Sequence, residues 1–162
     1  MAARTSGTEI RKGTAGAGMP PPGRFGKAVR DLMTNEVVSL SPLDDLTELL
    51  DRMADEHVRH MPIVDRDGDL VGLVTERSLA QIALSSDAGE LTLSAQRELL
   101  RRRRIREIMT TEVDTIEPDQ SLREAAELLL ENKVGCLPVV EGTHVVGILT
   151  ESDFVRRFLE RE

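Results

Sequence analysis

The most reactive side chains in this sequence are one cysteine and three histidines. Cys136 could act as a nucleophile, but nucleophilic catalysis requires a positioned base, and the sequence shows none beside it. His57 and His60 stand three residues apart, but a zinc site requires further ligands, and His144 is expected on a hairpin turn. We therefore expect Cys136 to be a small buried thiol, and we expect neither catalytic residues nor a metal site.

Thr150 and Asp153 form a second group of chemical interest. A hydroxyl residue followed three positions later by an acidic residue has the spacing of a capping box, in which the two side chains satisfy free N–H groups at a helix start. The same hydroxyl and carboxylate could instead contact a bound ligand. The spacing alone leaves both interpretations open.

Two copies of one sequence unit position these residues. Residues 29–65 align with residues 105–141 without a gap, and residues 70–80 align with residues 145–155. Of the 48 aligned positions, 15 are identical, which indicates an internal duplication.

Each copy predicts the same order of elements: strand, helix, strand, strand, helix. The first helix is indicated by apolar residues at helical spacing and by the capping-box pairs Asp45 with Glu48 and Ser121 with Glu124. Turns that contain an acidic residue and a glycine predict the two hairpins. The predicted strands are residues 37–40, 61–64 and 70–74 in the first copy, and 113–116, 137–140 and 145–149 in the second.

A unit of about 50 residues is too small to bury a stable core by itself. We therefore expect an α+β or α/β fold in which the two copies pack through their sheets about a pseudo-twofold axis. The expected divisions are a first repeat over residues 29–84, a helical linker over 85–104 and a second repeat over 105–162. Residues 1–28 are rich in Gly, Ala and Pro, carry five basic residues against one acidic, and are expected to be a disordered tail. The linker ends in Arg101–Arg104, which is either a solvated helix end or a patch for an anion or a partner.

The composition excludes several classes of function. With 162 residues, the chain is too short for a large multidomain enzyme. Trp and Tyr are absent and the net charge is -8, which argues against stacking platforms for bases and against general nucleic-acid binding. No apolar run approaches the roughly 18 residues that a membrane span requires, and the first 28 residues lack the apolar core of a secretion signal. We expect a cytoplasmic protein that contacts neither a membrane nor nucleic acid.

Three motifs follow one another in both copies. They are IREIMTTEV or its counterpart VRDLMTNEV, then HVRHMPIVD or VGCLPVVE, then VGLVTERSL or VGILTESDF. In this order the repeat resembles the cystathionine β-synthase (CBS) domain, and the pair resembles one stand-alone CBS tandem, or Bateman module. The resemblance implies a regulatory module that is not an enzyme, that senses an adenosine-containing ligand in a cleft between the repeats, and that signals to an unidentified partner protein. It also implies a homodimer. The alternative is a ligand-free module for dimerisation or scaffolding.

The resemblance also implies where the ligand binds. The nucleotide-contacting pattern of the family matches Gly147, Thr150 and Asp153. A carboxylate can accept hydrogen bonds from both ribose hydroxyls, a hydroxyl and free helix N–H groups suit a ribose or phosphate oxygen, and glycine leaves room for the ligand. The expected ligands are AMP, ADP, ATP or an S-adenosyl compound such as S-adenosylmethionine, and no cofactor is obligatory. The base would rest on backbone and aliphatic surface at Gly135, Leu137 and Pro138.

The two repeats differ at the residues that the resemblance assigns to the ligand. Ser78 stands in the first repeat where Asp153 stands in the second. The resemblance implies that the phosphates of a ligand held by Asp153 meet Arg59, His60 and Arg77 of the first repeat. The Ser78 side has neither the carboxylate nor a basic set, so we expect one occupied site rather than two.

Overall fold

The computed structural model describes residues 10–12, 28–85 and 91–160. Most of the predicted N-terminal tail therefore lies outside the described residues, as do residues 86–90 of the predicted linker. Within the tail, Ile10–Lys12 form strand β1, which pairs with β4 (Val113–Thr115). These three residues have regular structure, and disorder of the tail residues outside the described ranges stays a prediction.

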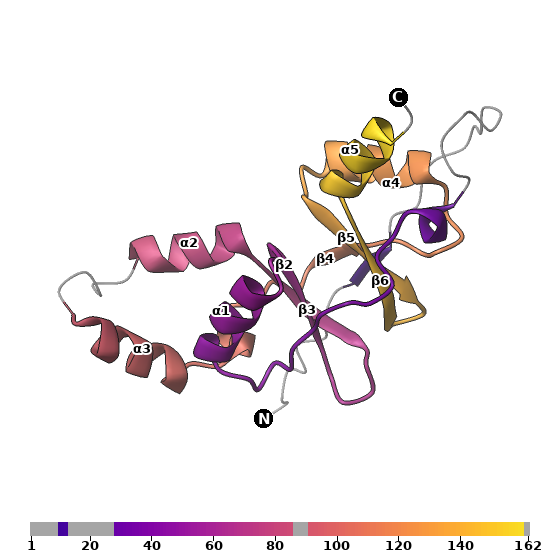
Figure 1. Cartoon of the computed structure of the whole chain (residues 1–162). Helices are drawn as coiled ribbons and strands as arrows, with labels where there is room; N and C mark the ends of the chain where they lie inside the picture. The colour runs from indigo at the N-terminus through magenta and orange to yellow at the C-terminus, as the bar shows by residue number, and fades with distance from the viewer. Residues whose placement is uncertain (1–9, 13–27, 86–90, 161–162) are drawn as a thin grey trace. The chain divides into compact units, whose positions relative to one another are not determined.

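The described residues form two compact units (Figure 1). The first unit consists of the described residues between 38 and 113, and the second of those between 10 and 37 and from 114 onwards. The first unit contains α1 (Leu46–Asp55), β2 (His60–Val64), β3 (Leu70–Thr75), α2 (Glu76–Ser85) and α3 (Leu93–Arg102). The second unit contains α4 (Leu122–Glu131), β5 (Cys136–Glu141), β6 (His144–Thr150) and α5 (Glu151–Leu159). The order helix, strand, strand, helix occurs in both units, which confirms the mixed α/β class and the duplication.

The two hairpins have matching irregularities. Strands β2 and β3 are antiparallel, as are β5 and β6, and the pairing shifts between Ile63 and Val64 and between Val139 and Val140. Their turns contain Gly68 (φ 82°) and Gly142 (φ 66°), in a left-handed conformation that a side chain disfavours. The turn and the shift together fix the register, so that the last residue of each hairpin stands directly before helix α2 or α5.

The first predicted strand of each copy is shorter than expected. In the first copy, residues 37–40 contribute a single parallel bridge between Leu40 and Ile63. The chain reaches Pro42 two residues later, which has no N–H to extend the ladder, and Asp45 then caps the start of helix α1. The second copy has the short strand β4 and a matching bridge.

Each repeat opens with a segment that belongs to the unit of the other repeat. Ile105 is fully buried in the core of the first unit, and Thr110 exchanges two backbone hydrogen bonds of 2.9 Å with β3. Val29 is fully buried in the core of the second unit, and Thr34 exchanges backbone hydrogen bonds of 2.9 and 3.0 Å with β6. The repeats seen in the sequence and the compact units of the structure therefore have different boundaries.

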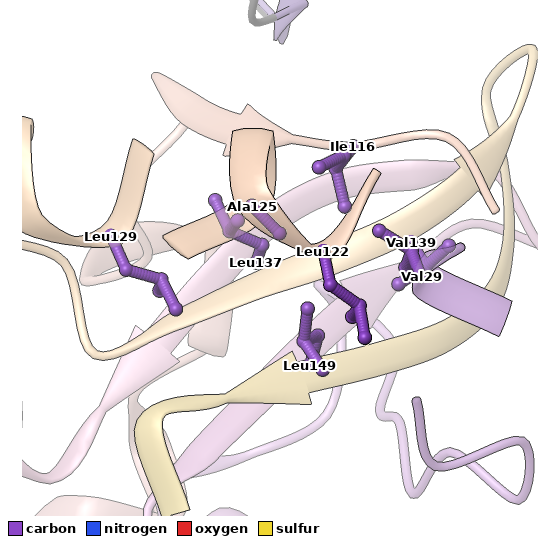
Figure 2. Close-up of a cluster of buried hydrophobic side chains, with 8 residues drawn as sticks. All are labelled: Val29, Ile116, Leu122, Ala125, Leu129, Leu137, Val139 and Leu149. Carbon is purple, nitrogen blue, oxygen red and sulfur yellow. The ribbon is translucent and has the colours of Figure 1, made fainter. Parts of the chain in front are cut away.

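Each unit has its own hydrophobic core. In the second unit the core joins one face of α4 to the hairpin and the opening segment (Figure 2). Its residues are Val29, Ile116, Leu122, Ala125, Leu129, Leu137, Val139 and Leu149. The core of the first unit consists of Leu40, Leu46, Leu49, Met53, Met61, Ile63, Val74 and Ile105. The segment acquired from the other repeat thus contributes a fully buried residue to each core.

Candidate ligand site at the start of helix α5

Asp153 is a buried carboxylate in the first turn of helix α5, and it is 7% exposed. Its Oδ2 accepts two hydrogen bonds from Thr150, one from the backbone N at 2.8 Å and one from Oγ1 at 3.0 Å. Thr150 has an extended backbone, with φ -122° and ψ 162°, which is typical of an N-cap. The capping interaction predicted from the spacing is therefore present, and it engages one oxygen of the carboxylate.

The other carboxylate oxygen of Asp153 is engaged more weakly. Its Oδ1 accepts a hydrogen bond of 3.4 Å from Nη1 of Arg156, which lies three residues further along α5. Because a carboxylate oxygen offers about two acceptor sites, Oδ1 can also accept a hydroxyl of a ligand. Sequence reasoning missed Arg156, although an acid and a base three residues apart on a helix are a recognisable signal.

The first repeat builds the matching helix start from two hydroxyl side chains. The backbone N of Thr75 donates to Oγ of Ser78 at 3.0 Å, and the backbone N of Ser78 donates to Oγ1 of Thr75 at 3.2 Å. The hydroxyl of Ser78 also donates to the carbonyl of Thr75 at 2.7 Å. Helix α2 is therefore capped without a carboxylate, so a capped helix start does not by itself require Asp153.

Gly147 lies in β6, and its missing side chain serves a purpose different from the predicted one. A Cβ at this position would lie 2.6 Å from Sδ of Met33 and 3.1 Å from the carbonyl oxygen of Thr34. Gly72 makes the same close approach to Met109 in the first unit. The opening segment of the other repeat therefore fills the space beside this glycine, and a contact between Gly147 and a ligand stays a prediction.

The residues predicted to support a base lie at the start of β5. The carbonyl of Gly135 accepts the backbone N–H of Glu151 at 3.3 Å, which ties the start of β5 to the start of α5. Leu137 is fully buried in the core (Figure 2), and Pro138 is buried as well. The side chain of Leu137 is therefore not available to a base, and a contact through the backbone of Leu137 or Pro138 stays a prediction. Gly135 and its neighbour Val134 are half-buried and retain accessible surface.

Cys136 lies opposite Thr150 in the ladder of β5 and β6 and is 2% exposed. Burial raises the pKa of its thiol from 9.0 to about 12. The thiolate is the reactive form of cysteine, so this residue is unreactive at neutral pH. The prediction of a small buried thiol is confirmed.

The basic residues predicted for the phosphates gather at the matching end of the first unit. The carbonyl of Arg59 accepts the backbone N–H of Glu76 at 2.9 Å, and His60 opens β2 opposite Thr75. Arg77 lies in the first turn of α2. The structure thus gathers these three residues at the start of α2 and the Asp153 group at the start of α5. That both groups contact one ligand stays a prediction.

The predicted linker contributes α3 to the first unit. A groove of about 520 Å³ runs between α1 and α3, and Asp51 and Arg97 form an exposed ion pair of 2.7 Å in it. Its lining carries charges of both signs and favours no single class of ligand. Residues Arg101 to Arg104 at the end of α3 are all exposed.

Three further findings concern metal ions, the turn at His57 and membranes. Among the described residues, no three His, Cys, Asp or Glu side chains gather in a way that could hold a metal ion. His57 has a left-handed backbone (φ 54°) at the turn after α1, and Lys133 repeats it (φ 53°) at the turn after α4. In the described ranges, no helix has the length and apolar character needed to cross a membrane.

A family model described as CBS domain matches residues 29–85 and 105–160, which are the two copies of the repeat. Among curated relatives, the homoserine O-acetyltransferase of Methanocorpusculum labreanum is 35% identical over 75% of this chain, and that match spans 22% of the enzyme. An uncharacterised protein of Bacillus subtilis, YlbB, is 30% identical over 77% of this chain and 78% of its own length. The homoserine O-acetyltransferase of Methanohalobium evestigatum matches over 23% of its length, so the chain spans less than a quarter of either enzyme.

Solved structures show the same fold. A Vibrio cholerae protein assigned to acetoin utilization (AcuB) is 33% identical, with a TM-score of 0.70 over 83% of this chain and 91% of its own. CBSX2 in complex with AMP is 26% identical, with a TM-score of 0.69 over 84% of this chain and 98% of its own. A third structure is the CBS domain pair of protein MJ0100 in complex with 5′-methylthioadenosine and S-adenosyl-L-methionine. It is 25% identical, with a TM-score of 0.70 over 83% of this chain and 98% of its own.

Proposed function

Because the chain belongs to the CBS domain family, we propose that it is a regulatory module without catalytic activity, which binds an adenosine-containing ligand beside Asp153. Two similar structures support this class of ligand, since one holds AMP and the other holds 5′-methylthioadenosine with S-adenosyl-L-methionine. All three molecules contain an adenosine group. Binding of AMP, ADP, ATP or an S-adenosyl compound would change the affinity of the chain for a partner protein.

The observation that carries this proposal is the contrast between Asp153 and Ser78. Both side chains accept the backbone N–H of the threonine that precedes their helix, and a hydroxyl suffices for this in α2. Burial of a carboxylate costs more free energy than burial of a hydroxyl. The carboxylate in α5 therefore favours a second role, and accepting ribose hydroxyls is a role that a serine fills poorly.

The geometry at Asp153 suits a pair of neighbouring hydroxyls. One ribose hydroxyl can donate to Oδ1 of Asp153, and the other can donate to a lone pair on Oγ1 of Thr150, whose own proton points to Oδ2. Free N–H groups in the first turn of α5 attract a ribose or phosphate oxygen. The adenine would lie against the half-buried backbone at Val134 and Gly135 rather than on Leu137.

The phosphates of the ligand, in this proposal, meet Arg59, His60 and Arg77. Three basic side chains in a chain with a net charge of -8 form a local exception to its acidic surface. Charge-assisted hydrogen bonds from arginine to phosphate are among the stronger polar interactions in proteins. This basic set favours AMP, ADP or ATP over a positively charged S-adenosyl compound.

A ligand-free module for dimerisation or scaffolding is the second candidate function. It is favoured by apolar side chains on α5, where Val155, Phe158 and Leu159 are 60%, 58% and 65% exposed. Exposed apolar surface of this kind is typical of a protein contact. A homodimer is part of both candidates, whereas Asp153 has only a capping role in the second. A sole cysteine that is buried and unpaired fits the reducing cytoplasm, where we place the protein.

Thermal unfolding with a panel of AMP, ADP, ATP and S-adenosylmethionine separates the two candidates. A ligand at 100 times its Kd adds about 2.7 kcal/mol to the free energy of unfolding. This corresponds to a rise in Tm of roughly 5–10 °C for a chain of this size. We expect such a rise with at least one member of the panel. No rise with any of them at millimolar concentration contradicts ligand binding and leaves the scaffold.

The variant Asp153→Ser separates the carboxylate from the helix cap, because it copies the cap that Ser78 provides in the first repeat. We expect ligand affinity to fall about 10- to 100-fold, since hydrogen bonds to a charged group are lost. The Tm of the unliganded variant should stay close to that of the wild type. Ser78→Ala is the matched control, which should cost about 1 kcal/mol of stability and leave affinity unchanged. Equal losses of affinity in both variants would contradict the assigned site.

A further inference from the structure

The carboxylate of Asp153 has one oxygen to offer a ribose, and Arg156 already contacts that oxygen. Oδ2 is engaged by the two hydrogen bonds from Thr150, at 2.8 and 3.0 Å. Oδ1 accepts Nη1 of Arg156 at 3.4 Å. Arg156 therefore shares the oxygen that the proposed function assigns to a ribose hydroxyl.

Arg156 is held loosely in this contact. Its side chain is 68% exposed, whereas that of Asp153 is 9% exposed. The distance of 3.4 Å is longer than the about 2.7–2.9 Å that is usual between a guanidinium and a carboxylate. The next residue, Arg157, pairs with Glu160 at 3.7 Å instead.

The first repeat lacks both members of the ion pair. Ser78 stands in place of Asp153, and Gln81 stands in place of Arg156. Both Gln81 and Arg156 are exposed side chains in the second turn of the helix that follows the hairpin. The carboxylate and the guanidinium thus occur together in one repeat and are both replaced by neutral residues in the other.

We propose that Arg156 determines the specificity of this site for a phosphorylated adenosine ligand over an unphosphorylated one, an inference that rests on the proposed function. A ribose hydroxyl that donates to Oδ1 of Asp153 competes with Arg156 for this oxygen and weakens a contact that is already long. With adenosine, the guanidinium keeps only this weakened partner. AMP competes in the same way but supplies a phosphate, whose oxygens match the paired donors of a guanidinium. The weakening of the ion pair therefore opposes the binding of adenosine and is offset for AMP.

Isothermal titration of the full chain with adenosine and with AMP tests this specificity. Wild type should bind AMP more tightly than adenosine. In Arg156→Gln, adenosine should bind more tightly than in wild type and AMP more weakly, so that the ratio of the two Kd values falls about tenfold. Arg157→Gln is the matched control on the same helix and should keep the wild-type ratio. The exposed position of Arg156 predicts that its variant folds normally, which the unliganded Tm checks.

Other results would overturn the specificity role of Arg156. One such result is an unchanged ratio of the Kd values for adenosine and AMP in Arg156→Gln. Another is a fall of this ratio in Arg157→Gln as large as the fall in Arg156→Gln. Equal weakening of both ligands also does so, because Arg156 then acts only as a counter-charge that orients Asp153. A wild-type chain that binds S-adenosylmethionine but neither probe overturns the phosphate specificity alone. A wild-type chain that binds no adenosine compound overturns the proposed function as well.

Discussion

Replacing Gly147 with alanine tests whether the opening segment of the first repeat completes the second unit. The added Cβ would lie 2.6 Å from Sδ of Met33 and 3.1 Å from the carbonyl oxygen of Thr34. Both distances are well below the about 3.5–4.0 Å of an optimal contact. The Met33 side chain can rotate, but two hydrogen bonds, of 2.9 and 3.0 Å, hold the backbone of Thr34 against Ile148. The alanine must therefore push the segment away from β6.

We expect Gly147→Ala to lower the free energy of unfolding by about 1–3 kcal/mol, the usual cost of overpacking. The sign of the change in the free energy of unfolding shows whether the close contact exists. Gly147 lies within a strand and is absent from the residues with positive φ, so a side chain is compatible with its backbone. Without the close contact, alanine would raise stability by about 0.4–1 kcal/mol by restricting the unfolded chain. The expected loss corresponds to a fall in Tm of roughly 2–12 °C.

Urea unfolding followed by circular dichroism measures this change, and a double-mutant cycle with Met33→Ala assigns it. Removing the Met33 side chain relieves the closest contact, so the double variant should lose less stability than the sum of the single variants, by about 1 kcal/mol. In the first unit, a Cβ at Gly72 would also lie 2.6 Å from a methionine sulfur, that of Met109. The same cycle with Gly72 and Met109 should therefore show the same non-additive loss of stability. A Gly147→Ala variant as stable as wild type, or a fully additive cycle, would refute the assigned packing.

Two further predictions concern a buried thiol and a helix cap. Because burial raises the pKa of Cys136 from 9.0 to about 12, the folded chain keeps a proton between these values that the unfolded chain loses. Stability from this group is therefore complete below about pH 9 and falls by up to about 1.4 kcal/mol per pH unit as the pH rises above it. Urea unfolding at pH 8 and pH 10.5 should show this slope in wild type and lack it in Cys136→Ala, and parallel slopes would contradict it. Oδ1 of Asp45 accepts the N–H groups of Thr47 at 2.8 Å and Glu48 at 3.0 Å, so Asp45→Ala should cost about 1 kcal/mol. Asp45→Asn, which keeps an acceptor, should lose much less, and a similar loss in both variants would argue against capping.

Local signals predicted most of the elements correctly. Asp45 marks the residue before α1 because its carboxylate accepts two free N–H groups of the first turn. Gly68 and Gly142 mark the hairpin turns because few other residues tolerate their positive φ. Each signal acts within about four residues, so the sequence carries it without knowledge of the tertiary structure.

The exchange of opening segments could not be predicted, because an internal repeat does not reveal which copy packs on which. Met33 matches Met109 and Gly147 matches Gly72 in the alignment of the copies. Either methionine could in principle fill the space above either glycine. The alignment thus contains every partner of the contact but leaves the pairing undetermined, and the glycine was assigned to a ligand instead.

The candidate site could be predicted in part. Thr150 and Asp153 do contact each other as their spacing predicts. The burial of the Leu137 side chain was not predicted, because all residues of β5 up to Val140 are buried and the usual alternation of inner and outer faces does not apply there. Arg156 was not predicted because it lies one residue beyond the aligned segments 70–80 and 145–155. One helical turn beyond Ser78 and Asp153, Gln81 and Arg156 differ in charge as well.

The two oxygens of Asp153 divide the structural and the proposed binding roles between them. Oδ2 holds Thr150 and the start of α5, and a ligand on Oδ1 would leave these hydrogen bonds in place. On this side the ligand competes only with the exposed Arg156, so occupation of the site requires no unfolding of the helix start. Ser78 shows that the capping role survives without a carboxylate. Replacement of Asp153 by serine would therefore be close to neutral for folding yet costly for binding, which explains how one repeat can keep the fold of the other without its proposed ligand.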